Sequence, residues 1–194
     1  MVYVKVGGEY ADVCFNHLKL FLHMIDNELS NANVKIKQSA DPDSDGLYDL
    51  TEYLIGYGFV AIQRYISSTY PQTCKDKSQI YKIGQKLKND LYLVEVVNAG
   101  ANYWKHEPEW PFDLIYGQTD INGLTPISVN RSGDNLQNMQ KKTFGIITQL
   151  TPHSDYTLSN LLTEILQQLQ LNSEISFSPL LPFIENWRTE CEHE

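Results

Sequence analysis

Residues 41–52, with the sequence DPDSDGLYDLTE, carry acidic side chains at the spacing of a calcium-binding loop. Such loops place oxygen ligands at positions 1, 3, 5, 7, 9 and 12, the seventh through its backbone carbonyl, and need glycine at position 6 for a sharp turn. Gly46 occupies that sixth position. The candidate ligands are Asp41, Asp43, Asp45, Leu47, Asp49 and Glu52. The spacing therefore predicts a site for a single Ca²⁺ ion.

The same residues also fit the acidic start of a helix. The loop resembles EF-hand and thrombospondin type 3 calcium loops, which implies one bound ion, and carboxylates that converge without a cation repel one another. Against this, the chain holds no second copy of the loop and no clear incoming helix precedes it. Asp45 would instead cap the helix, while Asp49 and Glu52 would favour its positive dipole end. Both interpretations stay open at this point.

A second group of polar side chains follows one face of a predicted helix that ends near Lys105. It consists of Glu95, Asn98, Asn102 and His106. The spacings of three, four and four residues place these side chains in one stripe. Small residues at 99–101 would allow close approach of another helix or a ligand, with Trp104 and Trp110 as apolar walls. A buried polar stripe needs hydrogen-bond partners, so the pattern predicts either a seam between helices or a functional pocket.

The run NYWKH near the end of this helix resembles the HEPN superfamily of all-helical proteins. The signature of that family is an arginine, usually followed by a polar residue, and a histidine four to six residues after the arginine. In its ribonuclease members, the arginine and the histidine of two protomers form the active site at a dimer interface. Asn102 matches the polar position and His106 the histidine, but Ala101 stands where the arginine belongs.

The missing arginine bears directly on catalysis. A guanidinium stabilises phosphate charge through a planar fork of donors, which the point charge of Lys105 does not replace. The resemblance therefore implies a noncatalytic relative, unless Arg64 supplies the guanidinium from a neighbouring helix.

Apolar residues recur every three or four positions through most of the chain, as is typical of amphipathic helices. The predicted helices span residues 10–30, 47–66, 78–105, 135–150, 156–171 and 180–187. Proline, glycine and aromatic residues fill 107–130, which predicts a long loop or small hairpin there. We therefore expect an all-α fold, with residues 1–194 forming a single-domain, HEPN-like bundle of five to six helices.

Composition narrows the classes of function. The 194 residues carry a net charge of −9, which disfavours general binding of DNA or other nucleic acids. Three distant cysteines, Cys14, Cys74 and Cys191, predict neither a disulfide framework nor a zinc site and favour the cytoplasm. The N-terminal residues do not resemble a signal peptide, and the longest apolar run, 54–62, is too short to span a bilayer, so no membrane association is expected.

Three hypotheses of function follow. The first is a noncatalytic interaction or nucleotide-associated protein; the family resemblance implies a role in bacterial stress, defence or toxin-antitoxin systems. It also implies a homodimer formed through the second and third helices, with a protein, RNA or nucleotide as partner. The second is a metal-independent ribonuclease centred on His106. The third is a calcium-binding helical protein that uses loop 41–52; the other two require no cofactor.

Overall fold

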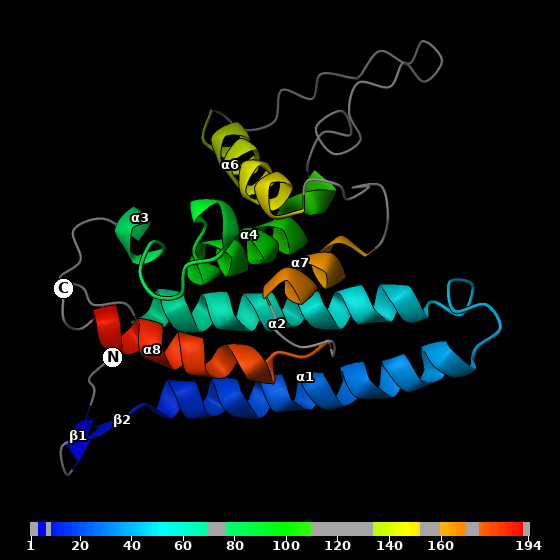
Figure 1. Cartoon of the computed structure of the whole chain (residues 1–194), viewed down its shortest axis with the longest axis horizontal. Coiled ribbons are helices and arrows are strands. Elements are labelled where there is room, and N and C mark those ends of the chain that lie inside the picture. The colour runs from blue at the N-terminus through cyan, green and yellow to red at the C-terminus, as the bar shows by residue number, and fades with distance from the viewer. Residues whose placement is uncertain are drawn as a thin grey trace.

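The protein is a bundle of helices, as the sequence predicts (Figure 1). The computed structural model describes residues 4–6, 9–69, 77–109, 134–151, 160–169 and 175–191. Its described helices are α1 (Val13–Gln38), α2 (Leu47–Thr69), α3 (Lys77–Ile80), α4 (Leu93–His106), α6 (Asp134–Leu150), α7 (Leu161–Leu169) and α8 (Leu181–Cys191), with short 3-10 turns η1 (Lys88–Asp90), η2 (Glu107–Glu109) and η3 (Ser178–Leu180). The prediction of an all-α bundle is confirmed.

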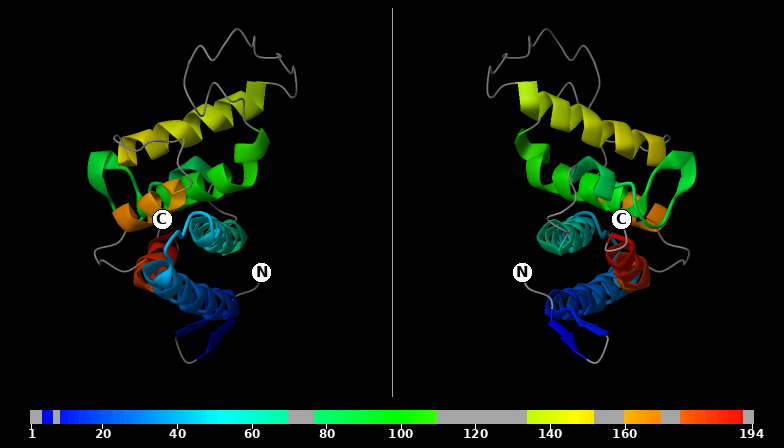
Figure 2. Two further views of the ribbon diagram at one scale, coloured as in Figure 1. Left: turned by 90° about the vertical axis from the view of Figure 1, so that its right-hand side faces the viewer. Right: turned by 90° about the vertical axis from the view of Figure 1, so that its left-hand side faces the viewer.

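A long antiparallel pair, α1 and α2, forms the base on which the other helices stack (Figures 1 and 2). The carboxylate of Asp12 begins α1 by accepting a hydrogen bond from the Phe15 amide at 2.8 Å. The same carboxylate accepts the Tyr65 hydroxyl at 2.6 Å, which joins the start of α1 to the last turns of α2. Helix α1 continues to Gln38, eight residues beyond the predicted end at residue 30. The polar segment after Ser30 still presents the buried Ala32 to the bundle.

The predicted helix 78–105 is wrong in its first half. The chain leaves α3 at Ile80 and turns back before α4, with positive φ angles at Gly84 (84°) and Asn89 (56°) that a helix cannot contain. The Leu93 amide donates to the Gln85 carbonyl at 2.9 Å and closes this turn. Ile80, Ile83 and Leu91 are nevertheless buried, so the apolar pattern marked the core correctly but not the helix.

The remaining elements cover the pair α1 and α2 on one side. Helix α4 packs on α2, α6 lies on α4 at the far edge of the stack, and α7 lies beside α4 over α2 (Figure 1). Helix α8 runs beside α1 and α2, and Figure 2 shows this order from both ends. The predicted helix at 135–150 agrees closely with α6, while α7 is described only from Leu161.

Two further described elements are not long helices: the N-terminal hairpin and the turn η2 after α4. Strands β1 (Val4–Val6) and β2 (Glu9–Ala11) form an antiparallel hairpin beside the start of α1, which the sequence did not predict. Of the predicted loop 107–130, the structure describes η2, and residues 110–130 lie outside the described residues. None of the described helices is both long and apolar enough to cross a membrane.

Large aromatic side chains lie in contact with glycines where helices meet. Phe59 and Phe177 meet edge to face with ring centroids 5.5 Å apart, and Phe177 occupies the space where Gly58 lacks a side chain. Trp187 is fully buried and donates its indole N–H to the Ile80 carbonyl at 2.9 Å. Close packing of this kind leaves no room for an added methyl group.

We expect Gly58→Ala to lower the free energy of unfolding by about 1–3 kcal/mol, because its Cβ would overlap the Phe177 ring. Gly145→Ala in α6 is the matched control, since a Cβ there meets no atom within 4 Å. The control should raise stability by about 0.4–1 kcal/mol. Urea unfolding followed by circular dichroism measures both, and equal effects of the two substitutions would contradict the packing described here.

Candidate functional site

Backbone and serine hydrogen bonds hold the loop at 41–46. The Gly46 amide donates to the Asp43 carbonyl at 2.8 Å, and Gly46 has a φ of 67°, as the sharp turn requires. The Asp41 carboxylate accepts the Ser44 hydroxyl at 2.7 Å and the Ser44 amide at 3.2 Å, and these bonds lower the pKa of Asp41. The Ser39 hydroxyl donates to Asp45 at 2.6 Å.

Glu52 turns away from this loop and into the bundle. Its side chain is buried, and its carboxylate accepts the Leu162 amide at 2.9 Å, the Thr163 amide at 2.8 Å and the Thr163 hydroxyl at 2.6 Å. These donors form the first turn of α7, whose amides have no partner within the helix. Burial raises the pKa of Glu52, although each of these hydrogen bonds acts to lower it. Glu52 therefore caps α7.

The structure thus does not bring the predicted calcium ligands together. A calcium loop of this type takes two oxygens from the carboxylate at position 12, which here is Glu52. Asp43 and Asp45 remain exposed in the loop, and Asp49 is exposed in the first turn of α2. Within the described residues, no group of three or more histidine, cysteine, aspartate or glutamate side chains could hold a metal ion.

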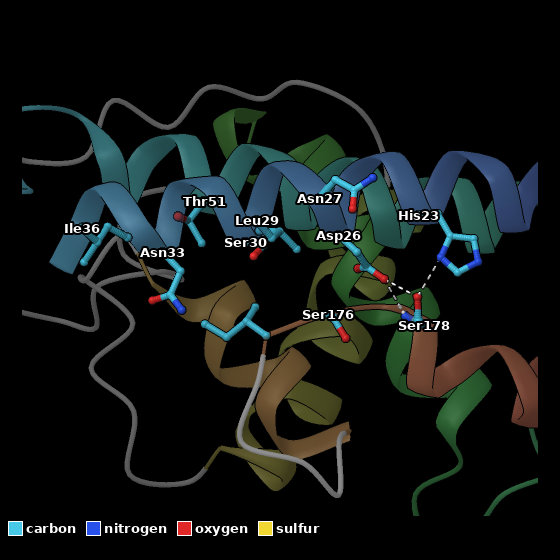
Figure 3. A pocket seen from close by; sticks show the side chains of 11 residues that line it. His23, Asp26, Asn27, Leu29, Ser30, Asn33, Ile36, Thr51, Ser176 and Ser178 are labelled. Atoms are coloured by element: carbon cyan, nitrogen blue, oxygen red, sulfur yellow. Dashed lines mark hydrogen bonds between the residues drawn. The ribbon is translucent and has the colours of Figure 1, made fainter. Parts of the chain in front are cut away.

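Asp26 on α1 caps the 3-10 turn η3, as Glu52 caps α7. Its carboxylate accepts the Phe177 amide at 2.5 Å, the Ser178 amide at 2.9 Å and the Ser178 hydroxyl. These contacts lie at one end of a cavity of about 340 Å³ between α1 and residues 175–178 (Figure 3). No local spacing in the sequence marks this site, because its partners lie about 150 positions apart.

Ser178, His23 and Asp26 are the residue types of a hydrolytic triad, but their order is not that of a triad. The Ser178 hydroxyl lies 3.1 Å from His23 Nδ1 and also contacts Asp26, so the serine lies between the other two (Figure 3). A nucleophilic serine needs the histidine in the middle, where it takes the proton from the hydroxyl. This arrangement fixes the start of η3 and does not activate a nucleophile.

The polar stripe on α4 forms a seam with α2. Gln63 Nε2 donates to Asn98 Oδ1 at 2.8 Å and to Asn102 Oδ1 at 2.9 Å, while Lys105 Nζ donates to Gln63 Oε1 at 2.7 Å. Glu95 lies half-buried one turn before Asn98. The two asparagines thus have the hydrogen-bond partner that a seam requires, Gln63, which no local spacing in the sequence marks.

His106 and Arg64 lie in different surroundings. His106 Nδ1 is 3.2 Å from Glu109 Oε2, in the turn that follows α4. Arg64 lies next to Gln63 in the sequence, but it lines a groove against α1, whereas Gln63 faces α4. The structure of a single chain therefore does not bring Arg64 and His106 together.

An exposed aromatic cluster lies beside the seam and consists of Tyr53, Tyr57 and Trp104. The Tyr53 and Trp104 rings meet edge to face with centroids 4.7 Å apart, and the Tyr57 and Trp104 centroids are 6.2 Å apart. Trp104 lies against Gly56, where any Cβ would overlap the indole. Tyr53 and Tyr57 are 54% and 53% exposed, so the cluster presents aromatic surface to solvent.

Comparison with known proteins identifies no relative: no family model, curated protein or solved structure matches the sequence.

We expect Glu52→Gln to lower the free energy of unfolding by about 1–3 kcal/mol at neutral pH, because an amide cannot accept all three hydrogen bonds and leaves a buried donor unpaired. Asp49→Asn is the matched control in the same helix, since Asp49 is exposed. It should change stability by less than about 0.5 kcal/mol. Equal losses in the two variants would contradict the capping role of Glu52.

The raised pKa of Glu52 predicts how stability depends on pH. Between the ordinary value of 4.5 and the raised folded value, the folded state binds more protons than the unfolded state, so this group adds stability as the pH falls through that range. The stability advantage of the wild type over Glu52→Gln should therefore grow as the pH falls from neutral toward the ordinary pKa of 4.5. Chemical unfolding of both proteins across this range measures the difference, and an advantage that shrinks would contradict the raised pKa.

Calcium should leave the melting temperature unchanged, because Glu52 is committed to α7. We expect melts at about 1 mM calcium and with a chelator to agree within about 1 °C. A calcium-dependent rise of several degrees that Asp43→Asn abolishes would instead support the calcium hypothesis and would require Glu52 to change partners.

Proposed function

We propose that this protein is a noncatalytic interaction module that forms a homodimer through the aromatic cluster on α2 and α4. The observation that carries the proposal is the exposure of Tyr53 and Tyr57, each packed edge to face against Trp104. Tyrosine and tryptophan are enriched at protein interfaces because they bury a large area at a small cost in side-chain entropy. The cluster is also held rigidly in place.

The rigidity comes from the contact between Trp104 and Gly56. The indole lies directly against the α2 backbone, and Tyr53 and Tyr57 lie one helical turn apart on either side of Gly56. A cluster that is ordered before binding loses little conformational entropy when it becomes buried. In a symmetric dimer the same cluster meets its own copy across a two-fold axis.

The polar groups near the cluster support binding rather than catalysis. Asn98 and Asn102 both accept hydrogen bonds from Gln63, and Lys105 donates to Gln63 as well. A ribonuclease of the HEPN type would need an arginine beside His106, and Arg64 lies in the groove toward α1. The resemblance to that superfamily agrees with a dimer through these helices and with a noncatalytic role in bacterial stress or defence.

The dimer predicts a mass of twice 22.3 kDa in solution at concentrations of about 100 µM. We expect Tyr53→Ser combined with Tyr57→Ser to yield monomers, because the substitutions remove the aromatic surface and leave the buried core intact. Light scattering coupled to size-exclusion chromatography measures the mass, and circular dichroism checks the fold.

The matched control is Leu20→Ser combined with Met24→Ser, which removes similarly exposed apolar side chains from α1. This control should remain dimeric. A monomeric wild type, or a tyrosine variant that stays dimeric, would overturn the proposed interface.

A further inference from the structure

The exposed face of α2 carries charges of opposite sign at its two ends. Asp49, Tyr53, Tyr57 and Arg64 are all exposed, and their spacings of four, four and seven residues place them in one stripe along the helix. Helix α2 lies between α1 and α4 (Figures 1 and 2). Trp104 on α4 contacts the tyrosines of the stripe, and Arg64 borders the groove toward α1. The stripe therefore has an acidic end, an aromatic centre and a basic end.

Neither end of the stripe is paired with an opposite charge. Within the described part of the chain, Asp49 and Arg64 take part in no ion pair. Fifteen residues separate them, which is about 22 Å along a helix, so the two side chains do not reach each other in one chain. Asp43 and Asp45 are exposed in the adjoining loop and add to the acidic end.

The basic end consists of one arginine. Arg64 is the single lysine or arginine that lines the groove, with His17 beside it. The carboxylate of Asp12 also lies at this end, where it accepts the Phe15 amide with one oxygen and the hydroxyl of Tyr65 with the other. Both oxygens of Asp12 are thereby engaged, and one carboxylate from a partner is enough to pair with the guanidinium of Arg64.

A second copy of α2, related by a two-fold axis, matches this order of charges. In an isologous contact, residue i of one copy meets residue j of the other, and j meets i. Asp49 and Arg64 are equidistant from the point between Gly56 and Tyr57, and Trp104 packs against Gly56 there. A two-fold axis through that point brings two pairs of opposite charges together and at the same time joins the two aromatic clusters.

We propose that the dimer is antiparallel along α2 and that Asp49 of each copy pairs with Arg64 of the other. The inference rests on the dimer proposed above and adds its orientation and the charges that select it. Helices that cross at about 20° stay close enough, over half of the distance between the two residues, for an arginine to reach a carboxylate. A parallel arrangement would set Asp49 against Asp49 and Arg64 against Arg64, and like charges opposite each other disfavour an interface.

The groove beside Arg64 fits the same orientation. An antiparallel contact about this point puts Tyr53 of one copy opposite residues 60–61 of the other. Ala61 lines the groove of about 300 Å³ between α1 and α2, together with Leu18 and Phe21. This apolar lining suits the ring of Tyr53, which is 54% exposed in the single chain.

Charge reversal at either end tests the orientation in the full chain. Asp49→Arg sets arginines opposite each other in both pairs, and Arg64→Asp sets aspartates opposite each other. Sedimentation equilibrium should give each variant a dimer dissociation constant at least about tenfold higher than that of the wild type. Asp49→Arg also makes this acidic chain less negative, so an effect of net charge alone would strengthen its association.

Two combinations should restore dimerisation. A chain with both substitutions carries the two charges in exchanged order and should dimerise within about threefold of the wild type. A mixture of the two single variants, one of them fluorescently labelled, should form heterodimers of similar affinity, since each arginine then faces an aspartate of the other chain.

Two control variants change the net charge by the same amounts at exposed positions outside the stripe. Glu185→Arg on α8 matches Asp49→Arg, and Lys141→Asp on α6 matches Arg64→Asp. Both controls should keep a dissociation constant within about threefold of the wild type. Circular dichroism checks that every variant is folded.

The outcomes separate this inference from the interface on which it rests. Single variants that dimerise as the wild type does, or a doubly substituted chain that does not recover, would overturn the antiparallel pairing. If the variant of Tyr53 and Tyr57 is monomeric in the same experiment, the aromatic interface then stands and only its orientation is wrong. A monomeric wild type, or a tyrosine variant that stays dimeric, overturns the proposed interface and this inference with it.

Discussion

Two carboxylates on the long helical pair hold the C-terminal elements in place. Glu52 on α2 accepts the first amides of α7, and Asp26 on α1 accepts the amides at the start of η3. The first amides of any helix have no partner within that helix and need acceptors once they are buried. Hydrogen bonds to an ionised acceptor are about twice as strong as neutral ones, so each carboxylate fixes the position of the element it caps.

A third contact attaches α8 to the C-terminal end of α2. Arg188 on α8 donates to the Thr69 carbonyl at 2.6 Å, where α2 ends and its last carbonyls have no helical partner. Among the described elements, α7 and α8 lie on one side of the α1 and α2 pair and leave the opposite side uncovered (Figure 2). The aromatic cluster and the groove beside Arg64 both lie on surface that these helices leave uncovered. The capping contacts thus determine which part of the α1 and α2 surface the described C-terminal helices cover.

The sequence predicted the helices well wherever local periodicity decided the structure. It located α2 and α6 closely and placed Asn98 and Asn102 in one stripe, because these features depend on residues three or four positions apart. It failed between Ile80 and Leu93, where a correct apolar pattern folds as a turn around Gly84. It also placed Glu52 either in a calcium loop or in the first turns of its own helix, since its actual partners lie 110 or more positions away and no local pattern indicates them.

Amide hydrogen exchange tests the central role of the two caps most directly. In the wild type, the amides of Leu162, Thr163, Phe177 and Ser178 should be protected. Asp26→Ala should accelerate exchange at Phe177 and Ser178 by about tenfold or more and leave Leu162 and Thr163 unchanged, because Glu52 caps them independently. Unprotected amides in the wild type, or exchange at Phe177 and Ser178 that does not respond to the substitution, would contradict the account.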